Sequence, residues 1–216
     1  MKMRSVMKLA LTIAISSLLI PPAYSTLKEG RRLIPFSLKD INGDRVTVKV
    51  EKGELVVIRE GPDGKRKEVV KPDLALLDFW ATWCPPCRLA VPHMQKIHEK
   101  YFLTRFQGEK MKAKEKKGGI AVIGIGLDRS GAKAIKPFAE ENKLNYILLS
   151  DPVPPLRDKK VITSPMKLAL AYKVRGIPTM YIVDSKGIIR KVHVGFAPGM
   201  EKGIEEEIKK LLPKKP

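Results

Sequence analysis

The stretch from residue 74 to residue 92, LALLDFWATWCPPCRLAVP, constrains the fold more strongly than any other part of this 216-residue chain. It opens with the apolar run Leu74–Trp80, which is typical of a buried strand, and continues through a short aromatic turn into a helical pattern. Two cysteines, Cys84 and Cys87, stand where the strand passes into the helix. The stretch therefore predicts a buried strand followed directly by a helix that begins at a C-x-x-C motif.

These two cysteines are the only ones in the chain, so they cannot belong to a larger disulfide framework. Three roles remain: a redox-active pair, an inert buried pair, or half of a metal site that His93 and His98 would complete. Along a helix that starts at the motif, His98 would lie about 16 Å from Cys87, whereas ligands lie about 2–2.3 Å from zinc. The spacing therefore favours redox chemistry, and we expect no metal. Cys84 would stand at the helix start, where free N–H groups and the helix dipole stabilise a thiolate.

The N-terminal segment has the layout of a secretory signal. Three basic residues within residues 1–8 precede an apolar run at 9–20, and the small-residue site Ala23-Tyr24-Ser25 follows. The run is shorter than the roughly 20 residues that span a bilayer. We therefore expect a signal peptide at 1–25, a single domain at 26–216, and a location in the periplasm or on the outer face of the cytoplasmic membrane. The alternative is a retained N-terminal anchor.

The chain is strongly basic, with a formal net charge of +19. Such a charge suits nucleic acid, an anionic membrane surface or an acidic partner. No aromatic residues are interleaved with the lysine clusters, so we expect no nucleic acid and at most weak, salt-screened contact with anionic membranes. Abundant lysine and glutamate with few amides also indicate a thermophilic, solvated surface.

Strand and helix patterns alternate along the rest of the chain. A hairpin is predicted at 34–50, because Asn42-Gly43 separates two strand-like runs and both residues tolerate a positive φ. A second hairpin is predicted at 54–71. The helix after the cysteines should reach about residue 106, and a lysine-rich loop should occupy 108–119. Further strands are expected at 120–127, 146–150, 180–184 and 188–194, with helices at 132–142, 166–172 and 201–212. This order predicts an α/β sheet covered on both faces.

Two motifs and the element order resemble the thioredoxin superfamily over nearly all of residues 31–212. The motifs are Trp83-Cys84-Pro85-Pro86-Cys87 and Gly176-Ile177-Pro178-Thr179. The N-terminal hairpin is typical of the exported TlpA/ResA-like branch. The resemblance implies a thioredoxin fold, with a central mixed β-sheet flanked by helices, an N-terminal β-hairpin and insertions at about 51–72, 103–118 and 152–165.

The resemblance also implies roles for the motif residues. Cys84, partly exposed, would attack a partner disulfide, and Cys87 would resolve the mixed disulfide. Pro85 and Pro86 suit the first helical turn, where a missing N–H is tolerated. Pro178 would be cis and would face the disulfide, although an ordinary trans proline is the alternative. The substrate-contacting residues would be Trp83, Pro85, Pro86, Gly176, Ile177, Pro178 and Thr179.

One position departs from the TlpA/ResA-like pattern. That branch commonly has a glutamate three residues after the second cysteine, and this chain has Ala90 there. Asp78, in the active-site strand, instead matches the buried aspartate of ordinary thioredoxins. We expect Asp78 to be the base that activates Cys87. The alternative is a structural carboxylate that is hydrogen-bonded at the strand end.

The function that follows is an extracytoplasmic thiol–disulfide oxidoreductase that reduces disulfides in client proteins. The resemblance implies a monomer with no cofactor beyond the Cys84–Cys87 pair, which a membrane thiol electron donor would re-reduce. The alternative is a dedicated assembly factor that binds one client, such as apocytochrome c or a copper-site protein, with little general reductase activity.

Overall fold

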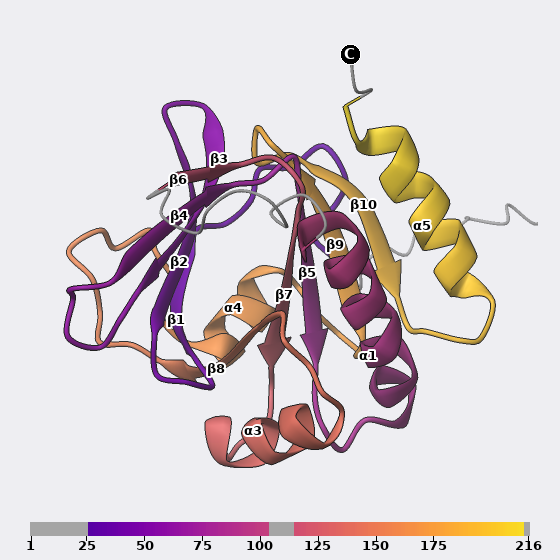
Figure 1. Ribbon diagram of the computed structural model, residues 1–216, viewed down its shortest axis with the longest axis horizontal. Helices are drawn as coiled ribbons and strands as arrows, with labels where there is room; N and C mark the ends of the chain where they lie inside the picture. The colour runs from indigo at the N-terminus through magenta and orange to yellow at the C-terminus, as the bar shows by residue number, and fades with distance from the viewer. Residues whose placement is uncertain (1–25, 104–114, 214–216) are drawn as a thin grey trace, which may run out of the picture.

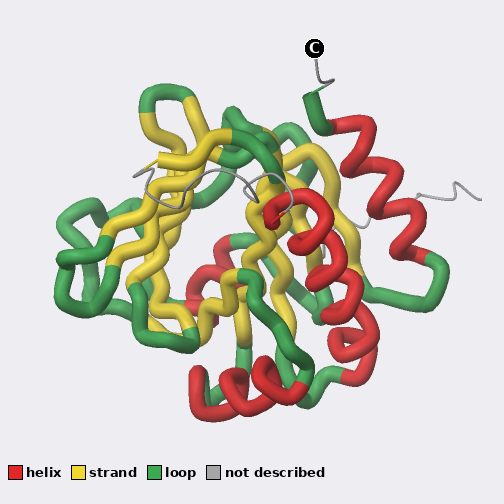
Figure 2. Tube along the Cα trace, in the orientation of Figure 1, coloured by secondary structure: helices red, strands yellow, loops and turns green. Residues whose placement is uncertain are grey.

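The computed structural model describes residues 26–103 and 115–213. These residues form a ten-stranded mixed sheet in the order β10-β9-β5-β7-β8-β1-β2-β3-β4-β6, with helices on both faces (Figures 1 and 2). The α/β class and the flanked central sheet expected from the sequence are confirmed. The expected signal peptide at 1–25 and most of the expected lysine-rich loop lie outside the described residues.

The centre of the sheet is β5 (Leu74–Trp80), all seven residues of which are buried. β7 (Ile120–Gly126) pairs with it in parallel and β9 (Thr179–Asp184) pairs with it antiparallel. β8 (Ile147–Pro152) lies beyond β7, and β10 (Ile189–Val194) forms the edge beyond β9. Burial on both faces explains why β5 and β7 are apolar at every position except Asp78 and the two β7 glycines.

The N-terminal strands are β1 (Phe36–Asp40), β2 (Arg45–Glu51), β3 (Glu54–Glu60) and β4 (Lys67–Lys71). Both predicted hairpins are present, and β2 also pairs with β3 along its whole length, so the four strands form one antiparallel meander. Antiparallel pairing of β1 with β8 makes the meander continuous with the central sheet.

One strand contradicts the predicted loop at 108–119. β6 (Glu115–Lys117) pairs in parallel with β4, whose outer edge offers unpaired backbone groups. The Lys117 ammonium also contacts the Glu54 carboxylate at 3.1 Å. Backbone pairing and this ion pair place a lysine-rich segment in the sheet, although its composition indicates a loop.

Two buried aspartates fix the β1–β2 turn against β3. Asp40 and Asp44 are both 2% exposed, and the Arg59 guanidinium donates to both carboxylates. Its Nε lies 2.8 Å from Asp44 Oδ2, and Arg66 Nη2 lies 2.5 Å from the same oxygen. Every carboxylate charge in this cluster therefore has a cationic partner, as buried charges require.

Replacing Asp44 with alanine should lower the free energy of unfolding by about 1–3 kcal/mol, because two arginines lose a buried partner but remain partly solvated. The matched control is Glu51→Ala, which removes an exposed carboxylate 3.2 Å from the Lys49 ammonium and should cost less than about 0.5 kcal/mol. Urea unfolding of both variants measures the difference. Equal losses would contradict a special role for the buried cluster.

The helices are α1 (Pro85–His98), α3 (Ala132–Glu141), α4 (Pro165–Ala171) and α5 (Met200–Leu211). Side chains of α1, α3 and α5 share one core on one face of the sheet, and those of α4 join the core on the other face. In Figure 1, α1 begins at the lower edge of the sheet, where β5 and β7 end. This edge therefore holds the cysteine motif.

The helix predicted to continue to about residue 106 is shorter than expected. The α-helix ends at His98 and a π-helical turn follows at Glu99–Leu103, while residues 104–106 lie outside the described part. Gln95 donates from its amide to Glu99 at 2.8 Å and to Asn145 at 2.7 Å. These bonds tie the helix end to the loop before β8, where the regular helix stops.

Candidate functional site

Cys84 and Cys87 form a disulfide at the start of α1. Cys84 is the N-cap residue, and its sulfur accepts a hydrogen bond from the Cys87 backbone N–H at 3.3 Å. Pro85 and Pro86 occupy the first two helical positions, where no backbone N–H is needed. The sulfur of Cys84 therefore lies at the positive end of the helix dipole, which stabilises a thiolate.

The cysteines are more deeply buried than expected from the sequence. Cys84 is 3% exposed and Cys87 is fully buried, so the expectation that Cys84 is partly exposed is wrong for the disulfide form. The carbonyl oxygen of Ile177 lies 3.6 Å from the Cys84 sulfur, and apolar neighbours including Phe196 belong to the same core cluster. Cys84 remains the less buried of the two cysteines.

The loop at residues 176–179 faces the disulfide, as the resemblance implied. The Ile177–Pro178 peptide bond is cis, which excludes the trans alternative. Thr179 begins β9 opposite Phe79 of β5, and its hydroxyl donates to the Gly176 carbonyl at 2.6 Å. The register of β9 on β5 therefore sets the position of the Ile177 carbonyl beside the Cys84 sulfur.

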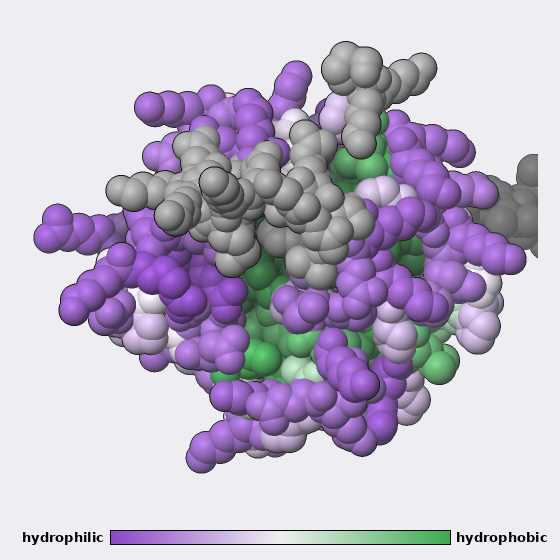
Figure 3. Space-filling view, viewed as in Figure 1, coloured by the Kyte–Doolittle hydropathy of each residue, from purple (hydrophilic) through white to green (hydrophobic). Residues whose placement is uncertain are grey.

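Exposed apolar side chains cluster around the motif. Trp83, next to Cys84, is 67% exposed, and Leu89 lies just beyond Cys87 on α1. Val194 pairs with Thr179 and is also exposed. A groove of about 590 Å³ runs beside Trp83, and its lining residues are Thr82, Trp83, Leu127, Asp128, Arg129, Ser130, Ala134 and Met166. Figure 3 shows hydrophobic side chains reaching the surface between α1, α3 and the sheet, in a surface that is otherwise largely hydrophilic.

Asp78 is fully buried on the face of β5 that packs against α1. The alternate residues Leu76 and Trp80 belong to the core that contains both cysteines, whereas Leu77 and Phe79 belong to the opposite core. Neither Asp78 carboxylate oxygen has a hydrogen-bond partner among the described residues. This finding contradicts the alternative of a hydrogen-bonded structural carboxylate. Burial raises the pKa of Asp78 from 3.8 to about 7.

Two more buried polar groups lie near Asp78 without a hydrogen-bond partner among the described residues, the Trp80 indole N–H and the Tyr146 hydroxyl. Gly124, opposite Asp78 on β7, makes room for both. A Cβ on Gly124 would lie 2.8 Å from Trp80 Nε1 and 3.2 Å from Tyr146 Cε2. Neither Trp80 nor Tyr146 was predicted from the sequence as a site residue. The one sequence signal that points to them is the pair of glycines in the apolar β7 run, since a glycine leaves space for large neighbouring side chains.

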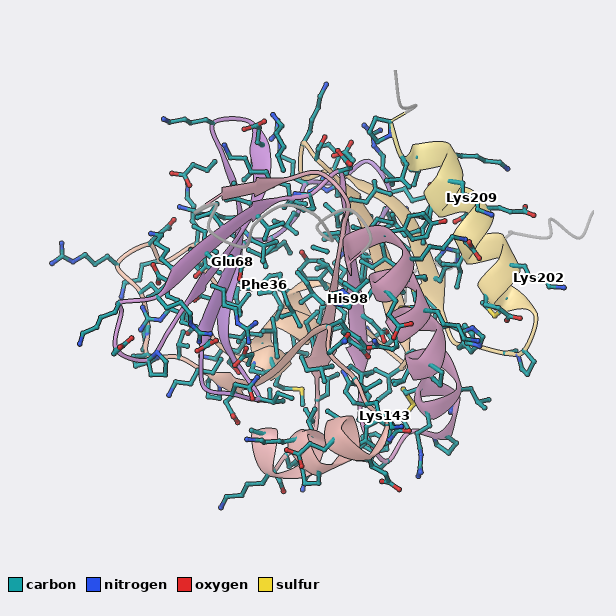
Figure 4. The ribbon with its side chains drawn as sticks, in the orientation of Figure 1. Phe36, Glu68, His98, Lys143, Lys202 and Lys209 are labelled. Atoms are coloured by element: carbon teal, nitrogen blue, oxygen red, sulfur yellow. A yellow bond between two sulfur atoms is a disulfide. The ribbon has the colours of Figure 1, made fainter. Side chains whose placement is uncertain are left out.

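His98 lies between α1 and the sheet (Figure 4). Burial lowers the pKa of His98 to about 4, so its imidazole is neutral at pH 7 and supplies no cation to this core. His93, the other histidine weighed as a metal ligand, lies beside the Phe196 ring with the ring centroids 5.3 Å apart.

A second set of contacts that was not predicted from the sequence holds the turn before the motif. Asp128, at the end of the strand next to β5, accepts hydrogen bonds from the Thr82 backbone N–H at 3.1 Å and from the Thr82 hydroxyl at 2.5 Å. These bonds link two loops that are 46 residues apart in sequence. They fix the backbone from which Trp83 projects.

Comparisons with known proteins agree with this geometry. The model of the AhpC/TSA family matches residues 60–192. Thioredoxin-like protein YneN of Bacillus subtilis is 31% identical over 169 residues, which cover 78% of this chain and 73% of that protein. Thiol-disulfide oxidoreductase ResA of Halalkalibacterium halodurans is 24% identical over 188 residues, which cover 87% of this chain and 79% of that protein.

A solved structure shows the same fold. The thiol:disulfide interchange protein DsbE from Chlorobium tepidum aligns with a TM-score of 0.56 at 21% identity, over 87% of this chain and 100% of that chain. The thioredoxin fold that the two motifs implied is thus confirmed. No helix within residues 26–103 and 115–213 is long and apolar enough to cross a bilayer.

Proposed function

This chain belongs to the AhpC/TSA family and is a thioredoxin-like thiol–disulfide oxidoreductase, and from that premise we propose that it reduces disulfides in client proteins outside the cytoplasm. The single observation that carries the proposal is the position of the Cys84 sulfur. It caps α1, accepts the Cys87 N–H bond, and lies 3.6 Å from the Ile177 carbonyl of the facing loop. The helix start and the Cys87 N–H favour a thiolate at Cys84, which is the less buried of the two cysteines.

The cycle begins with the reduced pair. The Cys84 thiolate attacks one sulfur of a client disulfide, forms a mixed disulfide with it, and releases the other client sulfur as a thiolate. Cys87 then loses its proton to Asp78 and attacks the Cys84 sulfur. This second step forms the Cys84–Cys87 disulfide and releases the second client thiolate. Two electrons have passed to the client, and the disulfide form described above is the oxidised product.

The surroundings of the disulfide support a protein client. The exposed Trp83 ring, the groove beside it and the facing loop offer an extended client segment contacts on both sides of the reacting sulfurs. Pro85 is exposed and Pro86 is half-buried, so both prolines border this surface. We propose that the client lies across Trp83 and along Gly176, Ile177, Pro178 and Thr179.

The remaining parts of the proposal rest on the sequence. We propose that residues 1–25 direct export, that residues 26–216 are one monomeric domain, and that a membrane thiol donor restores the dithiol. No bound cofactor is needed, because the two sulfurs carry both electrons themselves.

A turnover assay with insulin tests this function against its rival. With dithiothreitol as the electron source, a general reductase should accelerate insulin disulfide reduction well above the protein-free reaction. A dedicated assembly factor would barely exceed that background. The direction of electron flow is tested by equilibrating the Cys84–Cys87 pair with glutathione. A potential near about −270 mV fits a reductant, and one near about −120 mV would make the protein an oxidant and contradict the proposal.

A further inference from the structure

We propose that Tyr146 is a positioning residue for Asp78: its phenol donates a hydrogen bond to the ionised carboxylate and holds it ready to take the proton of Cys87. The inference rests on the proposed function, because it assigns a partner to the base of the resolving step. It starts from three buried polar groups, on Asp78, Trp80 and Tyr146, for which the structure shows no hydrogen-bond partner among the described residues. Unpartnered buried polar groups are rare and each calls for an explanation.

The strand register brings these groups together. Asp78 of β5 is opposite Gly124 of β7, and Gly124 is opposite Leu148 of β8. Tyr146 precedes Leu148 by two residues, and both side chains belong to the core that packs against α1. The Tyr146 ring therefore extends from the start of β8 across Gly124 toward β5.

Gly124 makes this approach possible. A Cβ at this position would lie 3.2 Å from Tyr146 Cε2 and 2.8 Å from Trp80 Nε1, closer than these side chains could remain. Any other residue would force the Trp80 ring to shift and would crowd the Tyr146 ring. The missing side chain thus leaves space in which Tyr146 and Trp80 lie against the residue opposite Asp78.

The Tyr146 hydroxyl and the Trp80 indole N–H are both hydrogen-bond donors. A donor binds an ionised carboxylate more strongly than a protonated carboxylic acid. The indole N–H can only donate, and the phenol is held in its neutral form, since burial and the charge of Asp78 both raise the pKa of Tyr146. In the disulfide form Cys87 has no proton to give and the acid can stay protonated. When Asp78 ionises for the resolving step, an unpaired charge in this core would be costly, and the Tyr146 O–H supplies the hydrogen bond that offsets it.

Few other titratable or charged groups among the described residues face the core that contains Asp78 and Tyr146. α1 contributes Cys84, Cys87 and His98, and the His98 ring centroid lies 6.4 Å from that of Tyr146. The π-helical turn contributes Tyr101, whose pKa is raised by burial. The Arg88 guanidinium of α1 lies over the Phe138 ring of α3 at 5.7 Å. His98 is already neutral above about pH 5, because burial lowers its pKa to about 4. A pH profile between about 6 and 9 therefore reports on Asp78 and the Cys87 thiol.

The test is Tyr146→Phe, which removes one hydroxyl and keeps the ring. A client mixed disulfide is formed on Cys84, and its release is followed by stopped flow as the pH is varied. Loss of the donor should move the midpoint of the profile upward by about one pH unit and slow release at pH 7 by about fivefold. Attack by Cys84 on the client, measured in the same experiment, should keep its wild-type rate and shows that the variant is folded.

The matched control is Tyr172→Phe. This tyrosine is also buried and its hydroxyl forms hydrogen bonds with the Ile34 backbone, but it belongs to the core on the opposite face of the sheet. The midpoint of the pH profile for release should stay at the wild-type value in Tyr172→Phe. An unmoved midpoint in Tyr146→Phe, or equal movement in both variants, would overturn the inference.

A double variant separates this inference from the proposed function. If Tyr146 acts through Asp78, adding Tyr146→Phe to Asp78→Asn should change the release rate no further. If Asp78→Asn slows release and Tyr146→Phe does not, only the inference fails. If Asp78→Asn itself leaves release unchanged, the proposed base is wrong and Tyr146 has nothing to position.

Discussion

Cys87→Ser should trap a client on this protein as a stable mixed disulfide through Cys84, and Cys84→Ser should trap none. The two cysteines differ in position rather than in type. Cys84 caps α1 and has the Ile177 carbonyl beside its sulfur, whereas Cys87 is fully buried in the first turn. A client sulfur can therefore reach Cys84 first, and Cys87 can act only on a sulfur already bound there.

Non-reducing electrophoresis and mass spectrometry of each variant after incubation with an oxidised client protein measure the trapping. Both variants should lose insulin turnover completely, because each lacks half of the dithiol. The matched control is the double variant Cys84→Ser with Cys87→Ser, which should form no adduct. An adduct on Cys87 in Cys84→Ser, at the level expected for Cys84, would reverse the roles and overturn the cycle.

The sequence was sufficient for the features that local rules decide. The apolar run, the C-x-x-C spacing and the two prolines place Cys84 at a helix start, and the structure has that helix beginning at Pro85. The Gly176-Ile177-Pro178-Thr179 loop was placed opposite the cysteines by family resemblance, and the cis bond and the Ile177 contact agree. Each of these signals is contained in a short, continuous stretch of sequence.

The features that were missed depend on contacts between distant segments. The pairing of β6 with β4 joins two lysine-rich segments whose composition alone indicates solvent. The bond from Thr82 to Asp128 and the close approach of Tyr146 to Gly124 require the register of adjacent parallel strands. Exposure of Cys84 was overestimated for the same reason, since a loop from a distant part of the sequence covers its sulfur.

Asp78→Asn should stabilise the protein at neutral pH and slow its chemistry. The folded state holds the Asp78 proton up to a pKa of about 7, whereas an ordinary aspartate has a value of 3.8. Between about pH 4 and 7 the unfolded chain has released this proton and the folded chain has not, so stability attributable to Asp78 falls as the pH rises. Above pH 7 the accumulated loss is on the order of 3–5 kcal/mol, at about 1.4 kcal/mol per pH unit.

The contribution of His98 to the pH dependence of stability has the opposite sign to that of Asp78, and the two contributions must be separated. Its folded pKa of about 4 lies below the ordinary value of 6.5, so its contribution to stability is lost as the pH falls from about 6.5 to 4. The two groups partly cancel in the wild-type curve. The difference between Asp78→Asn and wild type removes the histidine contribution. This difference should be near zero at about pH 4, rise toward pH 7 and then remain constant.

The kinetic effect of the same variant follows from the thiol that Asp78 serves. A buried thiol with a pKa near the free value of about 8.5 is mostly protonated at pH 7, and only its thiolate attacks. The amide introduced by Asp78→Asn keeps the shape of the side chain but can accept no proton from Cys87. Release of the mixed disulfide should therefore slow by about 10²-fold, while attack by Cys84 is little changed.

Asp44→Asn is the matched control for this kinetic effect, because it changes another buried carboxylate, one that binds Arg59 and Arg66 at the β1–β2 turn and has no part in the proton transfer. Its release rate should stay near the wild-type value. Release rates for Asp78→Asn that match wild type between about pH 6 and 8 would show that another group takes the proton. If Asp78→Asn gains stability and releases the mixed disulfide at the wild-type rate, Asp78 has no catalytic role. Its burial would then lower stability without contributing to any step of the cycle.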